Sequence, residues 1–343
     1  MRAAAYTGNA TVETVERTPV PPGPGQVQIA VAYVGLCGTD LHVLHGDMDA
    51  RVATPAVLGH EMSGTVAAVG PGTTGVSPGD RVTVMPLDWD GTCPACLAGH
   101  QHVCQNLTFI GIDSPGALQQ WWNVPARCVV PLPAGLTLRH GALVEPVAVA
   151  VHDVRRADVR HGERVVVIGG GPIGVLVASV AREFGATAAV VEIDGGRRER
   201  AAALGFETVD PAAVDQAAWV REWTEGAGAD AVFEVSGAEA AVLAATSLLR
   251  VRGRLTVVAI HGQPRPVDLH RVFWRELTLL GARVYERRDF ETAAELLARG
   301  VIPADELITA VVPLARTADA FAQLDAGRAL KVLVDVGAEE AAA

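Results

Sequence analysis

Aromatic residues are scarce in this chain, at 5% of 343 residues, and acidic residues outnumber basic ones. Proteins that bind single-stranded nucleic acid present aromatic stacking platforms, and duplexes attract basic surfaces. Here the formal net charge is −11, and the densest basic cluster, Arg197-Arg198 with Arg200, is short. The composition therefore argues against a nucleic-acid partner, and we expect a small-molecule substrate instead.

Long hydrophobic runs are absent as well. A membrane-spanning helix needs about 18 apolar residues, and the closest candidate, 175–181, ends at Arg182. The N-terminus lacks the continuous apolar segment of a secretory signal. The chain has five cysteines, an odd number with three close together, which favours metal binding in a reducing compartment over a disulfide framework. We expect a cytoplasmic protein with no membrane partner.

The length of the chain predicts two domains. The pattern of apolar and turn residues also changes along it. Residues 1–146 are β-rich, with short apolar or alternating runs separated by Pro-Gly turns. From 147 to 282, apolar strands alternate with alanine-rich helical stretches, which predicts an α/β fold with a doubly wound parallel sheet. The strands that we predict are 26–34, 63–69, 80–85, 127–132, 164–168, 188–193, 231–235, 254–260, 308–313 and 331–336.

A glycine loop follows the apolar run 164–168. Its six residues, 169–174 (GGGPIG), have the spacing G-x-G-x-x-G and precede a helical stretch. In such a loop the first glycine permits a tight turn, the second lets a pyrophosphate approach the backbone, and the third allows close helix–strand packing. The helix N-terminus then offers free N–H groups to the phosphates. The predicted dinucleotide-binding residues are Gly169, Gly171, Pro172, Ile173 and Gly174.

An acidic residue, Glu192, lies 23 positions past Gly169, near the place where a carboxylate holds the adenosine ribose hydroxyls. It favours NAD, because a carboxylate repels the 2′-phosphate of NADP. Asp194 is the alternative acid, and Arg197 and Arg198 could instead receive that phosphate. We predict NAD as the cofactor, with Glu192 and Arg197 in its site and NADP as the less favoured alternative.

Metal-ligating residue types gather at two places before the glycine loop. The first group begins with Cys37, two positions before Thr39, and continues with His60-Glu61 and, much later, Glu145. A thiolate, an imidazole and a carboxylate are what an open catalytic zinc site needs. The second group has three thiols at short intervals, which is typical of a closed structural zinc site. Its members are Asp90, Cys93, Cys96 and Cys104.

Together these motifs resemble the zinc-containing medium-chain dehydrogenase/reductase family, most closely the branch with sorbitol, threonine and 2,3-butanediol dehydrogenases. The resemblance covers essentially the whole chain and includes 35–42 (GLCGTDLH), 59–64 (GHEMSG), 145–146 (EP) and 331–334 (KVLV). It implies a GroES-like catalytic domain at 1–146, completed by 283–343, and a Rossmann domain at 147–282. It also implies a homotetramer or a homodimer.

The resemblance implies roles for individual residues. In the family, zinc is held by the residues that match Cys37 and His60, with Glu61 or Glu145 completing the shell directly or through water. Thr39 matches a hydroxyl that receives the substrate proton. His42 matches a histidine that relays this proton to solvent, a task that suits an imidazole. Asp40 is expected to orient His60.

One departure from the family concerns its cysteine lobe, which begins with Cys where this chain has Asp90. A carboxylate oxygen also binds zinc, so we expect a second zinc held by one aspartate and three cysteines.

The expected function is hydride transfer between NAD and a secondary alcohol of a polyol, cyclitol or vicinal diol, with zinc polarising the oxygen. Glu61 and Glu145 would offer hydrogen-bond acceptors to a hydroxyl next to the reacting one. A threonine dehydrogenase is the alternative within the branch. A non-catalytic nucleotide-binding relative, or a zinc-free reductase, is disfavoured because Cys37 and His60 are both present.

Overall fold

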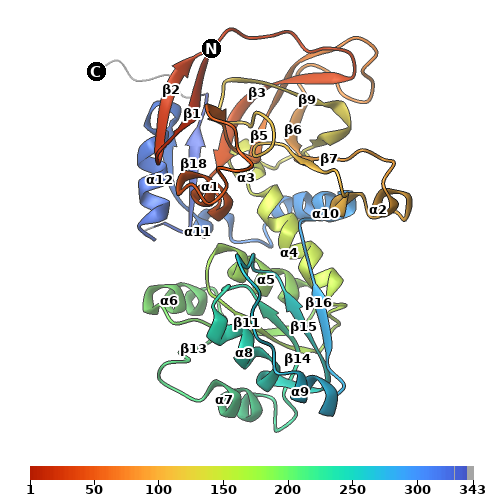
Figure 1. The fold of residues 1–343 in the computed structure, drawn as a ribbon, viewed down its shortest axis with the longest axis vertical. Coiled ribbons are helices and arrows are strands. Elements are labelled where there is room, and N and C mark those ends of the chain that lie inside the picture. Colours follow the sequence, from red (N-terminus) through yellow and green to blue (C-terminus); the bar gives the residue numbers. More distant parts are fainter. Residues whose placement is uncertain (328, 338–343) are drawn as a thin grey trace. The chain divides into compact units, whose positions relative to one another are not determined.

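The computed structural model describes residues 1–327 and 329–337, which cluster into two compact units (Figure 1). The first unit combines Met1–Glu145 with Glu286–Ala343, and the second is Pro146–Tyr285. These limits lie one and three residues from those expected from the sequence. Within the first unit, β18 (Lys331–Asp335) pairs antiparallel with β3 (Gln26–Gly35). The C-terminal segment is therefore an integral part of the first unit's main sheet.

The main sheet of the first unit has the order β10-β6-β5-β3-β18-β17, and β9 also pairs with β3. Residues on β3 alternate between buried and partly exposed, so one face of this strand packs into the core. Val27, Ile29 and Val31 supply that face. The remaining strands of this sheet are β5 (Glu61–Val69), β6 (Arg81–Val84), β9 (Trp121–Pro125), β10 (Val129–Pro131) and β17 (Ile308–Pro313).

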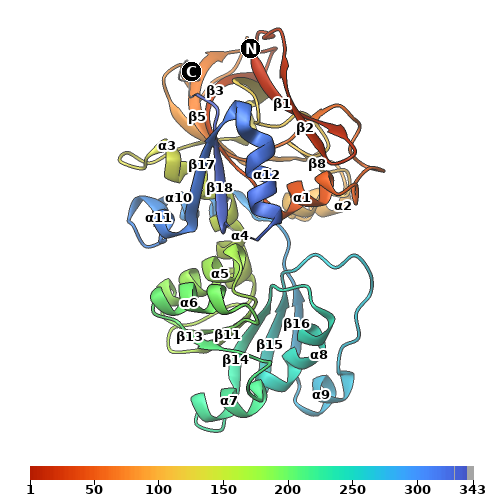
Figure 2. The same ribbon diagram turned by 90° about the vertical axis from the view of Figure 1, so that its left-hand side faces the viewer.

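The second unit contains a six-stranded sheet in the order β13-β12-β11-β14-β15-β16, and all its pairings are parallel. Helices lie on both sides of it (Figure 2), so its central strands are buried on both faces and almost wholly apolar. The six strands are β11 (Arg164–Ile168), β12 (Thr187–Val191), β13 (Glu207–Val209), β14 (Ala229–Glu234), β15 (Leu249–Val257) and β16 (Thr278–Gly281).

The α/β, GroES-like and Rossmann assignment is confirmed by this architecture and by the family models reported below. Two helices lie in segments where the sequence predicted only β structure or a domain boundary: α1 (Gly38–Leu44) and α4 (Val144–Arg156). The seven residues of α1 are too few to show a helical period, yet the helix positions three candidate site residues. Among the described residues, no helix is long and apolar enough to cross a membrane.

Candidate metal centres and cofactor loop

The turn from β3 into α1 presents Cys37. The Cys37 N–H donates to Asp40 Oδ2 at 2.8 Å, which ties the start of the helix to a fully buried carboxylate. Gly35 precedes this turn, and a Cβ added there would collide with Oε2 of Glu61. Only glycine therefore lets the strand pass so close to the glutamate.

His60 immediately precedes β5 and is buried, with its Nδ1 3.6 Å from Asp40 Oδ1. Neither of these two atoms has a hydrogen-bond partner among the described residues. Burial lowers the pKa of His60, but the nearby charges and hydrogen-bonding groups of Asp40 and Cys37 raise it by more, to well above its usual value. Asp40 thus lies where it can hold the imidazole through Nδ1, which leaves Nε2 for a ligand.

Glu61, the first residue of β5, is fully buried and lies 2.7 Å from Lys331 Nζ through both of its carboxylate oxygens. The ammonium also donates to the Leu36 carbonyl at 3.0 Å. Burial lowers the pKa of Lys331, but the charges of Glu61, Cys37 and Glu145 raise it by more, to above its usual value. Sequence reasoning assigned no role to Lys331, although it is the only lysine of the chain.

The other predicted catalytic residues lie around this centre. Thr39 Oγ1 is 3.8 Å from the Cys37 sulfur. His42 is 55% exposed in its side chain, and its Nδ1 lies 2.9 Å from Asp47 Oδ2, so it faces solvent. Glu145 is buried in the first turn of α4, close enough to influence Lys331.

Ligand atoms of Cys37, His60 and Glu61 lie within 4.8 Å of one another. The donor set of sulfur, nitrogen and oxygen suits zinc, and the unpartnered His60–Asp40 contact supports a metal-bound imidazole. Glu145 does not belong to this group as the side chains lie here. Because Lys331 already binds both oxygens of Glu61, that carboxylate would have to share its charge between an ammonium and a metal.

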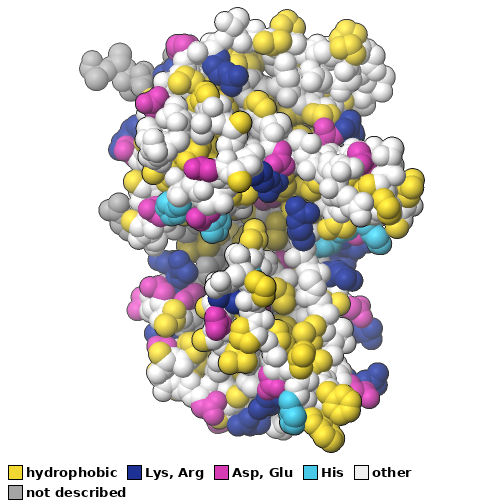
Figure 3. Space-filling view, in the orientation of Figure 1, with side chains coloured by type: hydrophobic (Ala, Val, Ile, Leu, Met, Phe, Trp, Pro, Cys, Tyr) yellow, Lys and Arg dark blue, Asp and Glu magenta, His cyan; other side chains and the backbone are white. Residues whose placement is uncertain are grey.

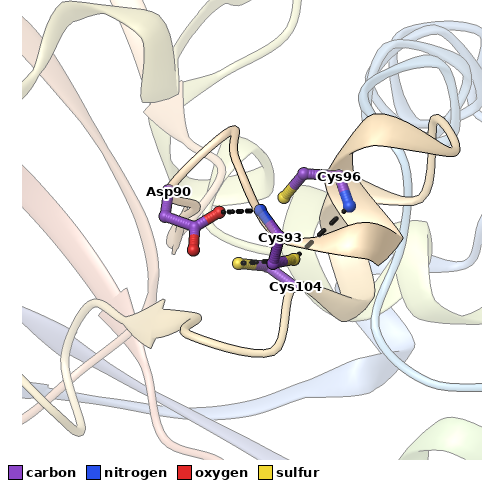
Figure 4. A group of neighbouring side chains, drawn as sticks. All are labelled: Asp90, Cys93, Cys96 and Cys104. Carbon is purple, nitrogen blue, oxygen red and sulfur yellow. Dashed lines mark hydrogen bonds between the residues drawn. The ribbon is translucent and has the colours of Figure 1, made fainter.

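A second cluster lies on the loop that includes α2 (Pro94–Leu97), where Asp90, Cys93, Cys96 and Cys104 surround one point (Figure 4). One ligand atom from each lies within 4.8 Å of the others. The three thiols are buried, whereas Asp90 is exposed. The structure thus brings together all four residues that the sequence grouped.

Backbone N–H groups point at the ligand atoms of this lobe. Asp90 Oδ1 accepts from Thr92 N at 2.8 Å and Cys93 N at 3.1 Å. The Cys93 sulfur accepts from the N–H groups of Cys96 and Gln105. Hydrogen bonds from Asn106 and from the backbone lower the pKa of Asp90, and backbone hydrogen bonds lower that of Cys93. These donors favour the anionic forms of Asp90 and Cys93, whereas burial raises the pKa of the Cys96 thiol to about 12. The convergence of the four ligand atoms on one point fits a cation.

In the second unit the glycine loop joins β11 to α5 (Pro172–Glu183), with Gly171 as the N-cap. Gly169 has a φ of 113°, which only glycine adopts readily. A Cβ on Gly174 would collide with the Gly169 carbonyl, whereas one on Gly171 would meet nothing closer than Arg197 Nη1 at 3.9 Å. The loop therefore keeps its tight turn at one end and open backbone at the other, which fits a pyrophosphate.

Glu192 follows β12 directly and is buried, with its two oxygens accepting from Gly170 N at 2.6 Å and Asp194 N at 2.8 Å. Each oxygen keeps a lone pair for a ribose hydroxyl. Asp194 instead caps α6 (Gly195–Ala203) by accepting from Arg197 N. Arg198 is tied to main-chain oxygens and to Asp210, whereas Arg197 lies 3.8 Å from Glu192 and is 40% exposed.

Comparisons with known proteins give matches over both units of the chain. Two family models match, the alcohol dehydrogenase GroES-like domain over residues 23–134 and the zinc-binding dehydrogenase over 172–299. A 2-dehydro-3-deoxy-L-galactonate 5-dehydrogenase of Pseudoalteromonas atlantica is 50% identical over 99% of this chain and 100% of its own. A sorbitol dehydrogenase of Halalkalibacterium halodurans is 33% identical over 97% and 99%. The solved structure of an alcohol dehydrogenase from Thermus sp. ATN1 has a TM-score of 0.92 at 28% identity, covering 98% and 100%.

Proposed function

Because this chain belongs to the zinc-containing medium-chain dehydrogenase/reductase family, we propose that it transfers hydride from a secondary alcohol of a sugar acid or polyol to NAD. The family implies zinc and a nicotinamide cofactor. The observation that carries the substrate class is the 50% identity, over nearly the full length, with an enzyme named for position 5 of a sugar acid. In a 2-dehydro-3-deoxy six-carbon acid, carbon 5 bears a secondary hydroxyl between two hydroxyl-bearing carbons.

The candidate zinc centre supports this proposal. Glu61 and Glu145 are both buried near Lys331, so a hydroxyl-bearing substrate would meet hydrogen-bonding carboxylates. A site that hydrogen-bonds a substrate hydroxyl rejects analogues that lack it. A polyol is the second candidate, favoured by the relative named for sorbitol.

Zinc held by Cys37 and His60 would polarise the substrate oxygen, and the nicotinamide would accept the hydride. The residues of the chain would then position and deprotonate the alcohol. The Thr39 hydroxyl, 3.8 Å from the sulfur, would accept the alcohol proton and release its own proton toward His42. His42, exposed on the same helix, would pass that proton to water. Lys331 would hold Glu61 in place and limit its negative charge.

We expect kcat/KM to be highest for alcohols whose reacting carbon has a hydroxyl on a neighbouring carbon. Kinetic comparison of 2-dehydro-3-deoxy hexonates, C4 to C6 polyols, cyclitols, 2,3-butanediol, 2-butanol, ethanol and threonine would measure it. The value of kcat/KM for hydroxyl-flanked alcohols should exceed that for monoalcohols by about a hundredfold or more. Equal or better turnover of 2-butanol would refute the proposal, and a preference for threonine would assign an amino-acid dehydrogenase instead.

The cofactor that we propose is NAD, supported by the buried carboxylate of Glu192 and by the contacts that occupy Arg198. The ratio of kcat/KM for NAD to that for NADP should be at least about 10, or 1.4 kcal/mol. Glu192→Gln keeps the acceptor oxygen but not the charge, so it should reduce this ratio about tenfold, whereas the exposed Glu199→Gln should leave it unchanged. A wild-type ratio near 1 would contradict the assignment.

We also propose a second zinc in the lobe, and a reducing, cytoplasmic location supported by five free cysteines, three of which lie in that lobe. The four converging ligand atoms of the lobe support this zinc. Its zinc would have a structural role, because all four ligand positions come from the protein.

Association with copies of this chain, as a homodimer or homotetramer, is proposed for the second unit. On α9 (Leu269–Trp274), Leu269, Phe273 and Trp274 are 68–74% exposed, and apolar side chains gather there in Figure 3. The next strand, β16, ends the sheet order and pairs only with β15 among the described residues. An open strand edge beside exposed apolar side chains favours self-association. Light scattering should give a multimer that Trp274→Glu shifts toward monomer.

A further inference from the structure

A carboxylate and an imidazole meet at the end of the second unit's sheet, outside the residues considered so far. Glu234 is the last residue of β14 and is fully buried. His261 follows β15 by four positions, and its side chain is 16% exposed. Its Nε2 lies 3.2 Å from Glu234 Oε2. The parallel strands thus bring two titratable groups together from two loops.

The two oxygens of Glu234 have different surroundings. Oε1 accepts three hydrogen bonds, from Ser236 N at 2.9 Å, Ser236 Oγ at 2.6 Å and Gly237 N at 2.9 Å. Oε2 and both ring nitrogens of His261 are buried without a well-formed hydrogen bond among the described residues. Buried polar atoms without partners cost free energy. The pair is therefore incomplete and has capacity for a polar ligand.

The pair lies beside the glycine loop. A Cβ placed on Gly169 would be 3.1 Å from Ser236 N, and one on Gly237 would be 3.8 Å from the Ile260 carbonyl. The loops that follow β11, β14 and β15 are therefore in contact at the carboxyl ends of the strands. In a sheet of this order, a dinucleotide binds across that edge, one mononucleotide to each half. Since Glu192 belongs to the half β11-β12-β13, the half β14-β15-β16 is left for the nicotinamide mononucleotide.

We propose that His261 contacts the nicotinamide half of the cofactor and that Glu234 is the residue that positions it. With Nε2–H directed at Glu234, the imidazole presents Nδ1 as an acceptor. The nicotinamide half offers matching donors, the ribose hydroxyls and the carboxamide NH2. The inference rests on the proposed dinucleotide binding and adds a polar contact that the glycine loop and Glu192 do not supply.

Binding of cofactor fragments tests the contact apart from turnover. Dissociation constants for AMP, ADP-ribose and NADH would be measured by calorimetry on wild type, His261→Leu and His261→Asn. We expect His261→Leu to weaken NADH about tenfold and to leave AMP unchanged. His261→Asn should recover most of this loss, because its carbonyl oxygen can take the place of Nδ1. If His261→Leu also binds ADP-ribose more weakly, the contact is to the ribose. If its affinity for ADP-ribose is unchanged, the contact is to the carboxamide.

His161→Leu is the matched control, since His161 is an exposed histidine of the same unit that precedes β11 by three positions, at the amino ends of the strands. It should leave all three dissociation constants unchanged. Equal weakening of AMP and NADH by His261→Leu would show a merely structural role and overturn the proposal, as would unchanged NADH binding. Failure of wild type to bind either NADH or NADPH would instead contradict the proposed function.

Glu234→Gln tests the positioning role. Its amide oxygen can keep the three hydrogen bonds of Oε1, while its NH2 donates to His261 Nε2 and moves the ring proton to Nδ1. We expect NADH to weaken as much as in His261→Leu, with no further loss in the double variant, because the two residues act as one unit. The 15N shifts of the His261 ring should show the tautomer exchange. Additive losses, or an unchanged tautomer, would overturn the positioning role.

Discussion

The two metal-ligand clusters of the first unit balance their charges in opposite ways. In the centre of Cys37, His60 and Glu61, the protein supplies a buried cation, because Lys331 binds both oxygens of Glu61 at 2.7 Å. In the lobe, a carboxylate and three thiols converge, and backbone N–H groups stabilise the anionic forms of Asp90 and Cys93. The first cluster has an internal counter-charge, whereas no lysine or arginine belongs to the second cluster as the described side chains lie.

This difference in charge balance favours a catalytic role for the first cluster and a structural role for the second. Partial neutralisation of Glu61 by Lys331 would leave a zinc bound at the first centre with more positive charge to act on a substrate oxygen. Four anionic ligands in the lobe would more than neutralise a zinc and leave it no open position. We therefore expect loss of the first metal to abolish catalysis, and loss of the second to lower stability with less effect on the reaction.

Cys37→Ala should produce the largest effect. Without the thiolate, kcat should fall at least about a thousandfold, or 4 kcal/mol, whereas NADH binding should persist because the glycine loop belongs to the other unit. Turnover and NADH fluorescence titration would measure the two. Cys128→Ala, which alters a buried cysteine outside both clusters, should keep activity and metal content. Substantial turnover by metal-free Cys37→Ala would refute the role of zinc.

Lys331→Met should have the next largest effect, on stability. Removing one partner of a buried ion pair leaves an uncompensated charge, which costs about 3 kcal/mol in the free energy of unfolding. Adding Glu61→Gln should recover most of this loss in urea denaturation. Arg51→Met, which breaks a partly exposed pair with Asp113, should cost under about 1 kcal/mol. If the double variant is as unstable as Lys331→Met alone, the charge argument is wrong.

Asp90→Asn should have the smallest effect. The amide keeps an acceptor for the N–H groups of Thr92 and Cys93 but loses the charge, so the second zinc should bind more weakly. The zinc content measured by metal analysis should fall from two toward one per chain. The free energy of unfolding should fall by about 1 kcal/mol, which lowers Tm by about 2–4 °C. Asp90→Cys, which supplies a fourth thiolate, should instead hold two zincs per chain. Two zincs retained in Asp90→Asn would exclude Asp90 as a ligand.

Sequence patterns predicted the features that depend on interactions between residues close together in the chain. The alternation of buried strands with helices indicated the parallel sheet, and the glycine spacing located the turn before α5, because backbone conformation at Gly169 depends on its own missing Cβ. The short intervals from Asp90 to Cys104 likewise predicted one cluster, since a short loop limits how far its ligands can separate. Helix α1 escaped prediction because its seven residues carry too little periodicity.

Contacts between distant segments were decided by the tertiary structure alone. Lys331 reaches Glu61 across 270 residues because β18 pairs with β3, which in turn pairs with β5. Glu234 reaches His261 because the carboxyl ends of parallel strands meet at one edge. The metal-ligating residues and the glycine loop in the sequence predicted zinc and dinucleotide binding. The partner that balances each buried charge followed only from strand pairing, because a charge removed from water must find its counter-charge in space and not along the chain.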